Sequence, residues 1–220
     1  MPAVHFSFML PSRDRISQQG EGVAAHPVSL GGDGWQVVPS HNFGNQDNVL
    51  AAVSAALQTD AWAVGTYDPT STSPLATLAQ HFDGRRWTAY PLPNVGVQEN
   101  SLLAVSMPMP GRAWAVGYYV DGHFQQRTLV QHFDGNNWSV VPSRSLGEEQ
   151  NILCGVAAIS DCDVWAVGAE EDAYGLWDTL TEHWDGSEWS VVKSVDPGVN
   201  GNQLYAVKAK SSHDIYAVGQ

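Results

Sequence analysis

The sequence predicts an all-β fold, a β-propeller of four-stranded antiparallel blades, and three observations lead to this class. Two motifs that contain tryptophan recur along the chain with the same period. In one of them, Trp87, Trp138 and Trp189 follow one another at intervals of 51 residues. Each period contains four short runs of strand-forming residues, separated by turns rich in Gly, Asp and Asn. A repeat of about 40–50 residues with four strands is the size of one propeller blade.

The two motifs keep the same phase along the chain, which chance similarity would not produce. One motif ends in Ala-Val-Gly, and its aromatic residue recurs at Trp62, Trp114, Trp165 and Tyr216. The other ends in a tryptophan after an Asp-Gly turn, and this residue recurs at Trp35, Trp87, Trp138 and Trp189. We expect these tryptophans, together with Trp184, to fill the wedge between neighbouring blades.

Each repeat is expected to hold four strands, which we name a to d in chain order. Strand a covers residues 50–55 in the first repeat. Propensity alone would favour a helix there, but the related segment 204–209 is not helical in character, so a strand is predicted. Strand b carries the Ala-Val-Gly motif, and strand c, residues 78–82, ends at an Asp-Gly turn. Strand d begins at the second Trp, and Pro142 ends one copy of it, as expected of an outer strand.

The repeats occupy residues 28–220 and follow a non-repeat N-terminal segment, residues 1–27. Three complete blades are expected, at about residues 50–91, 102–142 and 153–193. A fourth blade is split into strands a and b at residues 204–220 and strands c and d at residues 28–39. Pairing of the two halves would close a four-blade ring, and the alternative is part of a larger propeller.

The motifs resemble those of a known group of proteins. Asp163-Val-Trp-Ala-Val-Gly168 and Glu182-His-Trp-Asp-Gly-Ser-Glu-Trp189 are similar to the D-x-W-A-V-G and H-[FW]-D-G-x-x-W segments of bacterial β-propeller repeat proteins. These proteins are often labelled Kelch-like or galactose-oxidase-like. The resemblance covers about residues 28–219 and implies the propeller fold. It implies no particular activity and no catalytic residue, because propellers host many functions.

Composition excludes several classes of function. The chain has 10 Lys and Arg against 23 Asp and Glu, a net charge of −13, which argues against binding to nucleic-acid phosphates. No apolar run is long enough for a membrane span, and the first residues lack the features of a signal peptide. We therefore expect a cytoplasmic location, or an extracellular or cell-surface one if the N-terminus is truncated. Cys154 and Cys162 are expected to be free thiols, because the strand between them holds them apart.

Three histidines occupy one repeated position, His81, His132 and His183. A metal or acid–base role is the sharper interpretation, but residues on three different blades do not converge on one ion. We therefore expect each His to make a structural hydrogen bond, with the Asp of the adjacent turn as its partner (Asp83, Asp134 and Asp185). No metal site and no cofactor is predicted.

The most variable segments of the repeats are the b–c and d–a loops, which a meander places on one face. Variable loops on a repeated scaffold commonly bind ligands. The candidate ligand-binding residues there are Trp177, Tyr174, Tyr119, Tyr67, His123, Asn48, Asn100, Asn151, Asn202, Glu99 and Glu149. Two structural alternatives stay open. The aromatic residues could pack under their own loops, and each Asn could make an Asx-type bond that turns the chain into strand a.

Three functions are compatible with this face. The first is a non-enzymatic, lectin-like binding module for a glycan or a cell-surface ligand, with a carbohydrate or a protein as the partner. The second is a hydrolase or lyase that uses carboxylates near the propeller axis, such as Glu99, Glu149 or Glu170. The third is a scaffold segment of a longer multidomain protein. Self-association that completes the ring is a further hypothesis.

Overall fold

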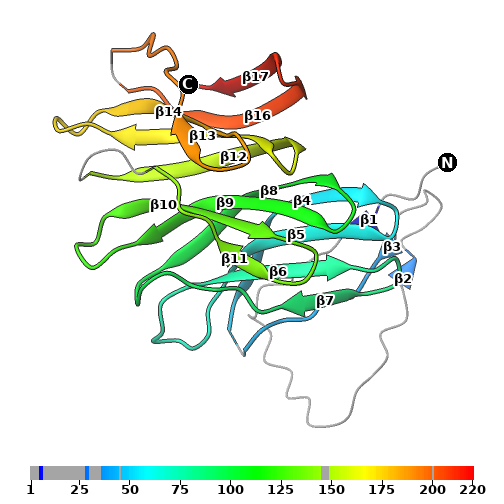
Figure 1. Cartoon of the computed structure of the whole chain (residues 1–220). Coiled ribbons are helices and arrows are strands. Elements are labelled where there is room, and N and C mark those ends of the chain that lie inside the picture. The colour runs from blue at the N-terminus through cyan, green and yellow to red at the C-terminus, as the bar shows by residue number, and fades with distance from the viewer. Residues whose placement is uncertain (1–4, 7–27, 30–35, 45, 145–148, 200) are drawn as a thin grey trace.

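The computed structural model describes residues 5–6, 28–29, 36–44, 46–144, 149–199 and 201–220. These residues are all-β (Figure 1). They form three four-stranded antiparallel sheets, one two-stranded sheet and one small three-stranded sheet. Successive four-stranded sheets stack face to face, as blades do in a propeller. The predicted fold class is therefore confirmed, and no helix in the described part of the chain could cross a membrane.

Each complete blade is a meander in which sequence neighbours pair. Blade 1 contains β4 (Asn48–Leu57), β5 (Asp60–Tyr67), β6 (Ala76–Phe82) and β7 (Trp87–Tyr90). Blade 2 contains β8 (Asn100–Met109), β9 (Arg112–Val120), β10 (Gln126–Phe133) and β11 (Trp138–Val140). Blade 3 contains β12 (Asn151–Ser160), β13 (Asp163–Glu171), β14 (Trp177–Trp184) and β15 (Trp189–Val191).

The glycine of the Ala-Val-Gly motif is required by an irregularity in strand a. The pairing of β4 with β5 shifts register between Leu50 and Ala52. At the shift the backbone of strand a lies against strand b, so that a Cβ on Gly65 would be 1.9 Å from the carbonyl oxygen of Val49. The same close approach recurs at Gly117, Gly168 and Gly219, so the bulge is part of every repeat.

The core lies between blades, and the repeated tryptophans form it. Trp62 is fully buried, and its ring centroid lies 4.7 Å from that of Phe133 and 5.0 Å from that of Trp138, both on the next blade. Trp114 makes the equivalent contacts with Trp184 and Trp189 of blade 3. The expected filling of the wedge between blades is confirmed for these residues, and Trp35 lies outside the described residues.

A half-blade follows blade 3. It consists of β16 (Leu204–Ser211) and β17 (Asp214–Gly219), the expected strands a and b. On its outer face Tyr216 is 62% exposed and Val218 is 64% exposed, whereas their counterparts Trp62 and Val64 in blade 1 are buried. The half-blade thus packs on blade 3, and its other face is open to solvent in the part of the chain that the structure describes.

At the other end, β2 (Val28–Ser29) pairs antiparallel with β3 (Gln36–Val37), as expected for a c–d hairpin. The sequence did not indicate β1 (His5–Phe6), which pairs parallel with β3. Val38, directly after β3, packs against the outer face of blade 1. The N-terminal hairpin therefore occupies the place of a preceding blade.

The described strands form an open stack. Among them β17 pairs with β16 alone and β2 pairs with β3 alone, and Figure 1 places these two hairpins at opposite ends of the stack. Within the described residues, the pairing of β17 with Val28–Ser29 that would close a four-blade ring is therefore not made. Leu30 itself lies outside the described residues.

Candidate binding face

The b–c and d–a loops lie on one side of the stack, and the short a–b turns lie on the other (Figure 1). This loop face carries many of the exposed large apolar side chains. They are Leu75, Val97, Phe124, Tyr174, Leu176, Val195 and Val199. The two b–c loops of blades 2 and 3, residues 121–125 and 172–176, contribute three of these side chains, and we call them the twin loops.

The first twin loop is held by Asp121. Its Oδ1 atom accepts hydrogen bonds from the backbone amides of His123, at 2.8 Å, and Gln125, at 3.1 Å. Its Oδ2 atom accepts one from Arg127 Nε at 2.8 Å. The bond from Arg127 and the backbone amide of Gln125 lower the pKa of Asp121 to about 2. The loop is therefore fixed by an ionised carboxylate at its base.

The second twin loop repeats this arrangement. The Oδ1 atom of Asp172 accepts from the backbone amides of Tyr174 and Leu176, at 2.8 and 2.9 Å. The amide of Asp172 donates to the Leu176 carbonyl, as that of Asp121 donates to Gln125 in the first loop. Asp121 and Asp172 are 51 residues apart, so this shared aspartate was a signal that the sequence analysis missed.

Phe124 has an unusual backbone conformation. Its φ of 64° lies in the left-handed region, and no other non-glycine residue among those described has a positive φ. The equivalent residue of the second loop is Gly175, with φ 79°. A left-handed conformation costs a residue with a Cβ roughly 1–2 kcal/mol. The Phe124 side chain is nevertheless 73% exposed, so the strained residue places a large apolar ring in solvent.

The d–a loops support the twin loops from beside them. Arg127 Nη1 donates to the Glu149 carbonyl at 3.1 Å, and the Gln126 amide donates to Gln150 Oε1 at 2.8 Å. In blade 3 the amide of Asn202 donates to the carbonyl of Trp177, where the second b–c loop ends. Each exposed tip therefore stands on a base that two loops share.

The four repeated asparagines serve the loops themselves. All four are buried, and each amide nitrogen donates to a carbonyl within its own d–a loop. The bonds run from Asn48 to Gln46, from Asn100 to Gln98, from Asn151 to Glu149 and from Asn202 to Gly198. The expected bonds that turn the chain into strand a are confirmed. The asparagines thus hold the loop face from beneath.

The aromatic candidates separate into exposed and packed residues. Tyr174, at 89%, and His123 are exposed on the twin loops. Tyr67 packs on Phe43, with ring centroids 5.0 Å apart, and Tyr119 packs against the core between blades 1 and 2. Trp177 is half-buried, and the backbone of the neighbouring d–a loop passes over it at Gly201. The structure therefore brings Tyr174 and His123 to the surface of the face, together with Phe124.

The candidate acids are spread over different connections. Glu99 accepts a hydrogen bond from the Tyr118 hydroxyl at 2.6 Å, and burial together with this carboxylate raises the pKa of Tyr118. Burial, followed by the charges of Asp178 and Asp196, raises the pKa of Glu170. Among the described residues no group of three His, Cys, Asp or Glu side chains could hold a metal ion. Cys154 and Cys162 are free.

One buried acid was not among the candidates. Glu182 occupies the position of Gln80 and Gln131, and each of those amides donates to a d–a loop carbonyl. Glu182 is fully buried, and burial raises its pKa to about 8. Its Oε2 atom accepts from the Arg144 amide, at 3.4 Å. The carboxyl therefore contacts the connection between blades 2 and 3.

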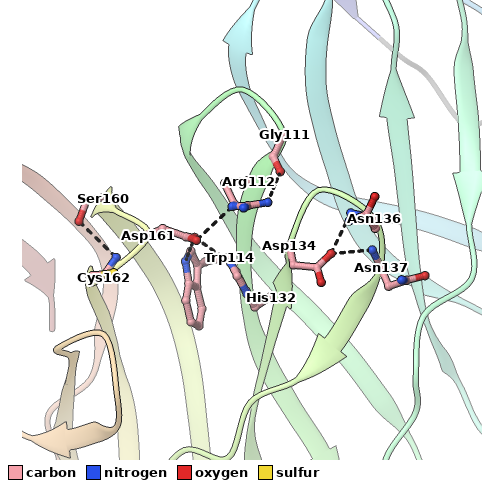
Figure 2. A network of polar contacts seen from close by, with 10 residues as sticks. All are labelled: Gly111, Arg112, Trp114, His132, Asp134, Asn136, Asn137, Ser160, Asp161 and Cys162. Atoms are coloured by element: carbon pink, nitrogen blue, oxygen red, sulfur yellow. Dashed lines mark hydrogen bonds and ion pairs between the residues drawn. The ribbon is translucent and has the colours of Figure 1, made fainter.

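The repeated histidines make structural contacts, but the predicted partner was wrong. His132 Nε2 lies 2.7 Å from Asp161 Oδ1 (Figure 2). His81 and His183 pair in the same way with Asp60 and Asp163. The turn aspartates instead accept hydrogen bonds from backbone amides of their own turns, as Asp134 does from Asn136 and Asn137. The antiparallel register explains this, since it places each His beside the Trp of strand b, next to the a–b turn.

Asp161 also joins two blades. It lies in the a–b turn of blade 3 and accepts from Trp114 Nε1 at 3.2 Å and from Arg112 Nε at 3.1 Å, both of blade 2 (Figure 2). Blade 1 shows a related link, in which Asp60 accepts from the amide of Gly111 in blade 2. The histidine position therefore belongs to the architecture of the stack.

No known protein family matches the chain, and no curated protein sequence matches it. Among solved structures, the chain is similar to one described as YCF48 bound to D1 peptide, with 13% sequence identity and a TM-score of 0.46. The match covers 85% of this chain and 52% of the YCF48 chain, so this chain spans about half the length of that protein.

Proposed function

We propose that this protein is a non-enzymatic binding module and that the tips of the twin loops contact its ligand. The observation that carries the proposal is Phe124, whose exposed ring is held in a left-handed conformation that glycine adopts in the sister loop. Strain of this kind is commonly retained where a side chain has a function. Asp121 and Asp172 fix the two tips, so little conformational entropy is lost when a ligand binds.

The exposed side chains favour a protein ligand. Phe124, Tyr174 and Leu176 offer two aromatic rings and an aliphatic group, the residue types that bury apolar area in protein interfaces. The chain also carries a net charge of −13, which favours a partner with basic side chains around an apolar patch. A glycan or a cell-surface ligand is the finer alternative, since Tyr174 could stack on a sugar ring beside the neighbouring carboxylates.

The test compares two single-residue variants. Phe124→Gly removes the ring and relieves the backbone, and Arg85→Ala changes an exposed residue in a c–d turn on the opposite face. The wild-type chain and both variants are crosslinked chemically to their partners in a cell extract. In a separate experiment, each protein is applied to a glycan array. The captured partner is then purified and titrated against each variant.

We expect at least a tenfold loss of affinity for Phe124→Gly and none for Arg85→Ala. Binding on the glycan array that is lost with Phe124→Gly would assign the ligand to carbohydrate. A purified partner that binds Phe124→Gly as tightly as it binds the wild type would refute the role of the twin loops.

A further inference from the structure

The space between blades is filled differently at the two complete interfaces. Between blades 1 and 2 a tyrosine from the end of strand d fills it. The Tyr90 ring lies with its centroid 4.9 Å from that of Trp62, edge-on, and 6.2 Å from that of Phe133. Leu92 packs against the same cluster. The protein thus holds a phenol ring of its own between two blades.

Between blades 2 and 3 the positions that follow strand d carry smaller residues, whereas the facing position on strand c carries a larger one. Val141 and Ser143 follow Tyr90 and Leu92 by 51 residues, and Trp184 replaces Phe133. A cleft of about 370 Å³ lies here, which is within the range of about 300–1,000 Å³ for small-ligand sites. Its lining residues are Val141, Pro142, Ser143, Arg144, Trp184, Ser187, Glu188 and Trp189.

The walls of the cleft suit an aromatic ligand. Trp184, which is half-buried, and Trp189, which is almost fully buried, are among the residues that line the cleft. Val141 and Pro142 add aliphatic groups to the lining. Arg144 and Glu188 are exposed and bring a donor and an acceptor to the rim. An aromatic ring with one polar substituent would therefore bury its ring and keep its polar atom hydrogen-bonded.

We propose that this cleft binds an aromatic ring of phenol size, the chemistry that tyrosine presents. The repeat supports this choice, because Val141, which lines the cleft, stands at the position of Tyr90, whose ring packs between blades 1 and 2. The site is independent of the twin loops, since it lies along strand d and the c–d turn of the next blade.

The experiment uses the full chain and two neutral probes, followed by protein NMR and calorimetry. p-Cresol represents a free phenol, and N-acetyl-tyrosinamide represents a tyrosine within a peptide. We expect saturable binding with a Kd on the order of 1 mM, as befits a probe of about eight to sixteen heavy atoms. Cyclohexanol, which has no π-system, should bind at least fivefold more weakly.

The decisive variant is Val141→Tyr, which restores the tyrosine of the previous blade. It should abolish binding of both probes and raise the Tm. The matched control is Val140→Tyr, the same change one residue earlier, at an exposed position that does not line the cleft. This control should bind both probes like the wild type.

Tyr90→Ala supplies a second, independent measurement, because it empties the space between blades 1 and 2. It should raise the number of p-cresol molecules bound from one to two. Binding of N-acetyl-tyrosinamide in these tests would assign the ring to a polypeptide, and binding of p-cresol alone would assign it to a small molecule. Undiminished binding to Val141→Tyr, or no binding of either probe to the wild type, would overturn the proposal.

Discussion

Phe124 and Gly175 occupy the same position in two loops that are otherwise closed alike, and both have a positive φ, 64° and 79°. In one loop the positive φ is adopted by glycine, for which this conformation carries no steric cost. In the other loop it is adopted by phenylalanine, for which it costs conformational energy. This pair gives a direct measure of the strain. We expect Phe124→Gly to be more stable than Phe124→Ala by about 1 kcal/mol, because alanine removes the ring but keeps a Cβ at positive φ. Urea denaturation of both variants tests this, and equal midpoints would contradict it.

The bulge in strand a requires glycine at position 65 more strictly than the loop requires it at position 124. Gly65→Ala should destabilise the chain by more than about 3 kcal/mol, because the new Cβ would lie 1.9 Å from a backbone oxygen that no side-chain movement can relieve. Gly122→Ala is the control, since a Cβ there has no neighbour within 4 Å. Chemical denaturation should show the control within about 0.5 kcal/mol of the wild type. Similar losses for both variants would show that the clash is not the cause.

Asp121 should make the stability of the chain depend on acidity. Its pKa is about 2 in the folded protein and about 4 in an unfolded chain, so its contribution is present above pH 4 and is lost as the pH falls toward 2. Asp121→Asn removes this titrating group. The difference in Tm between wild type and variant should therefore shrink from pH 5 to pH 2. A difference in Tm that stays constant over this range would contradict the role of the ionised Asp121 carboxylate in holding the loop.

Glu182 should act in the opposite sense. Its pKa is raised from about 4.5 to about 8, so folding retains a proton that the unfolded chain releases, and stability should fall as the pH rises from 4.5 to 8. Glu182→Gln restores the residue of the other blades and should stabilise the chain by roughly 2–4 kcal/mol at pH 8. At pH 4 the two proteins should differ little. Denaturation across this range is the measurement, and a pH-independent difference would be the contrary result.

The sequence predicted the fold well because the repeat is carried by residues with one role in every blade. Trp62 and Trp114 fill the same gap, and Gly65 and Gly117 meet the same bulge, so their spacing alone reveals the architecture. Such positions depend on contacts that each blade repeats.

The candidate face was predicted less completely, for physical reasons. The face itself follows from the meander, but which rings are exposed depends on contacts between loops, as between Tyr67 and Phe43. The partner of His132 lies on the next blade, 29 residues away, where local turn chemistry gives no signal. The backbone strain at Phe124 became visible only when its loop could be compared with the one that contains Gly175.

The open stack also has a consequence for how this protein unfolds. Strand a of each blade packs on strand a of the next, so stability accumulates between nearest neighbours, as in a one-dimensional array. An array of this kind opens first where its strands are least covered, and among the described residues β16–β17, with its exposed Tyr216, is such a place. Asp161 of blade 3 bridges the two blades, because its carboxylate binds His132 and Arg112 of blade 2. Loss of that one carboxylate would therefore weaken the coupling in mid-array and turn a single cooperative transition into two.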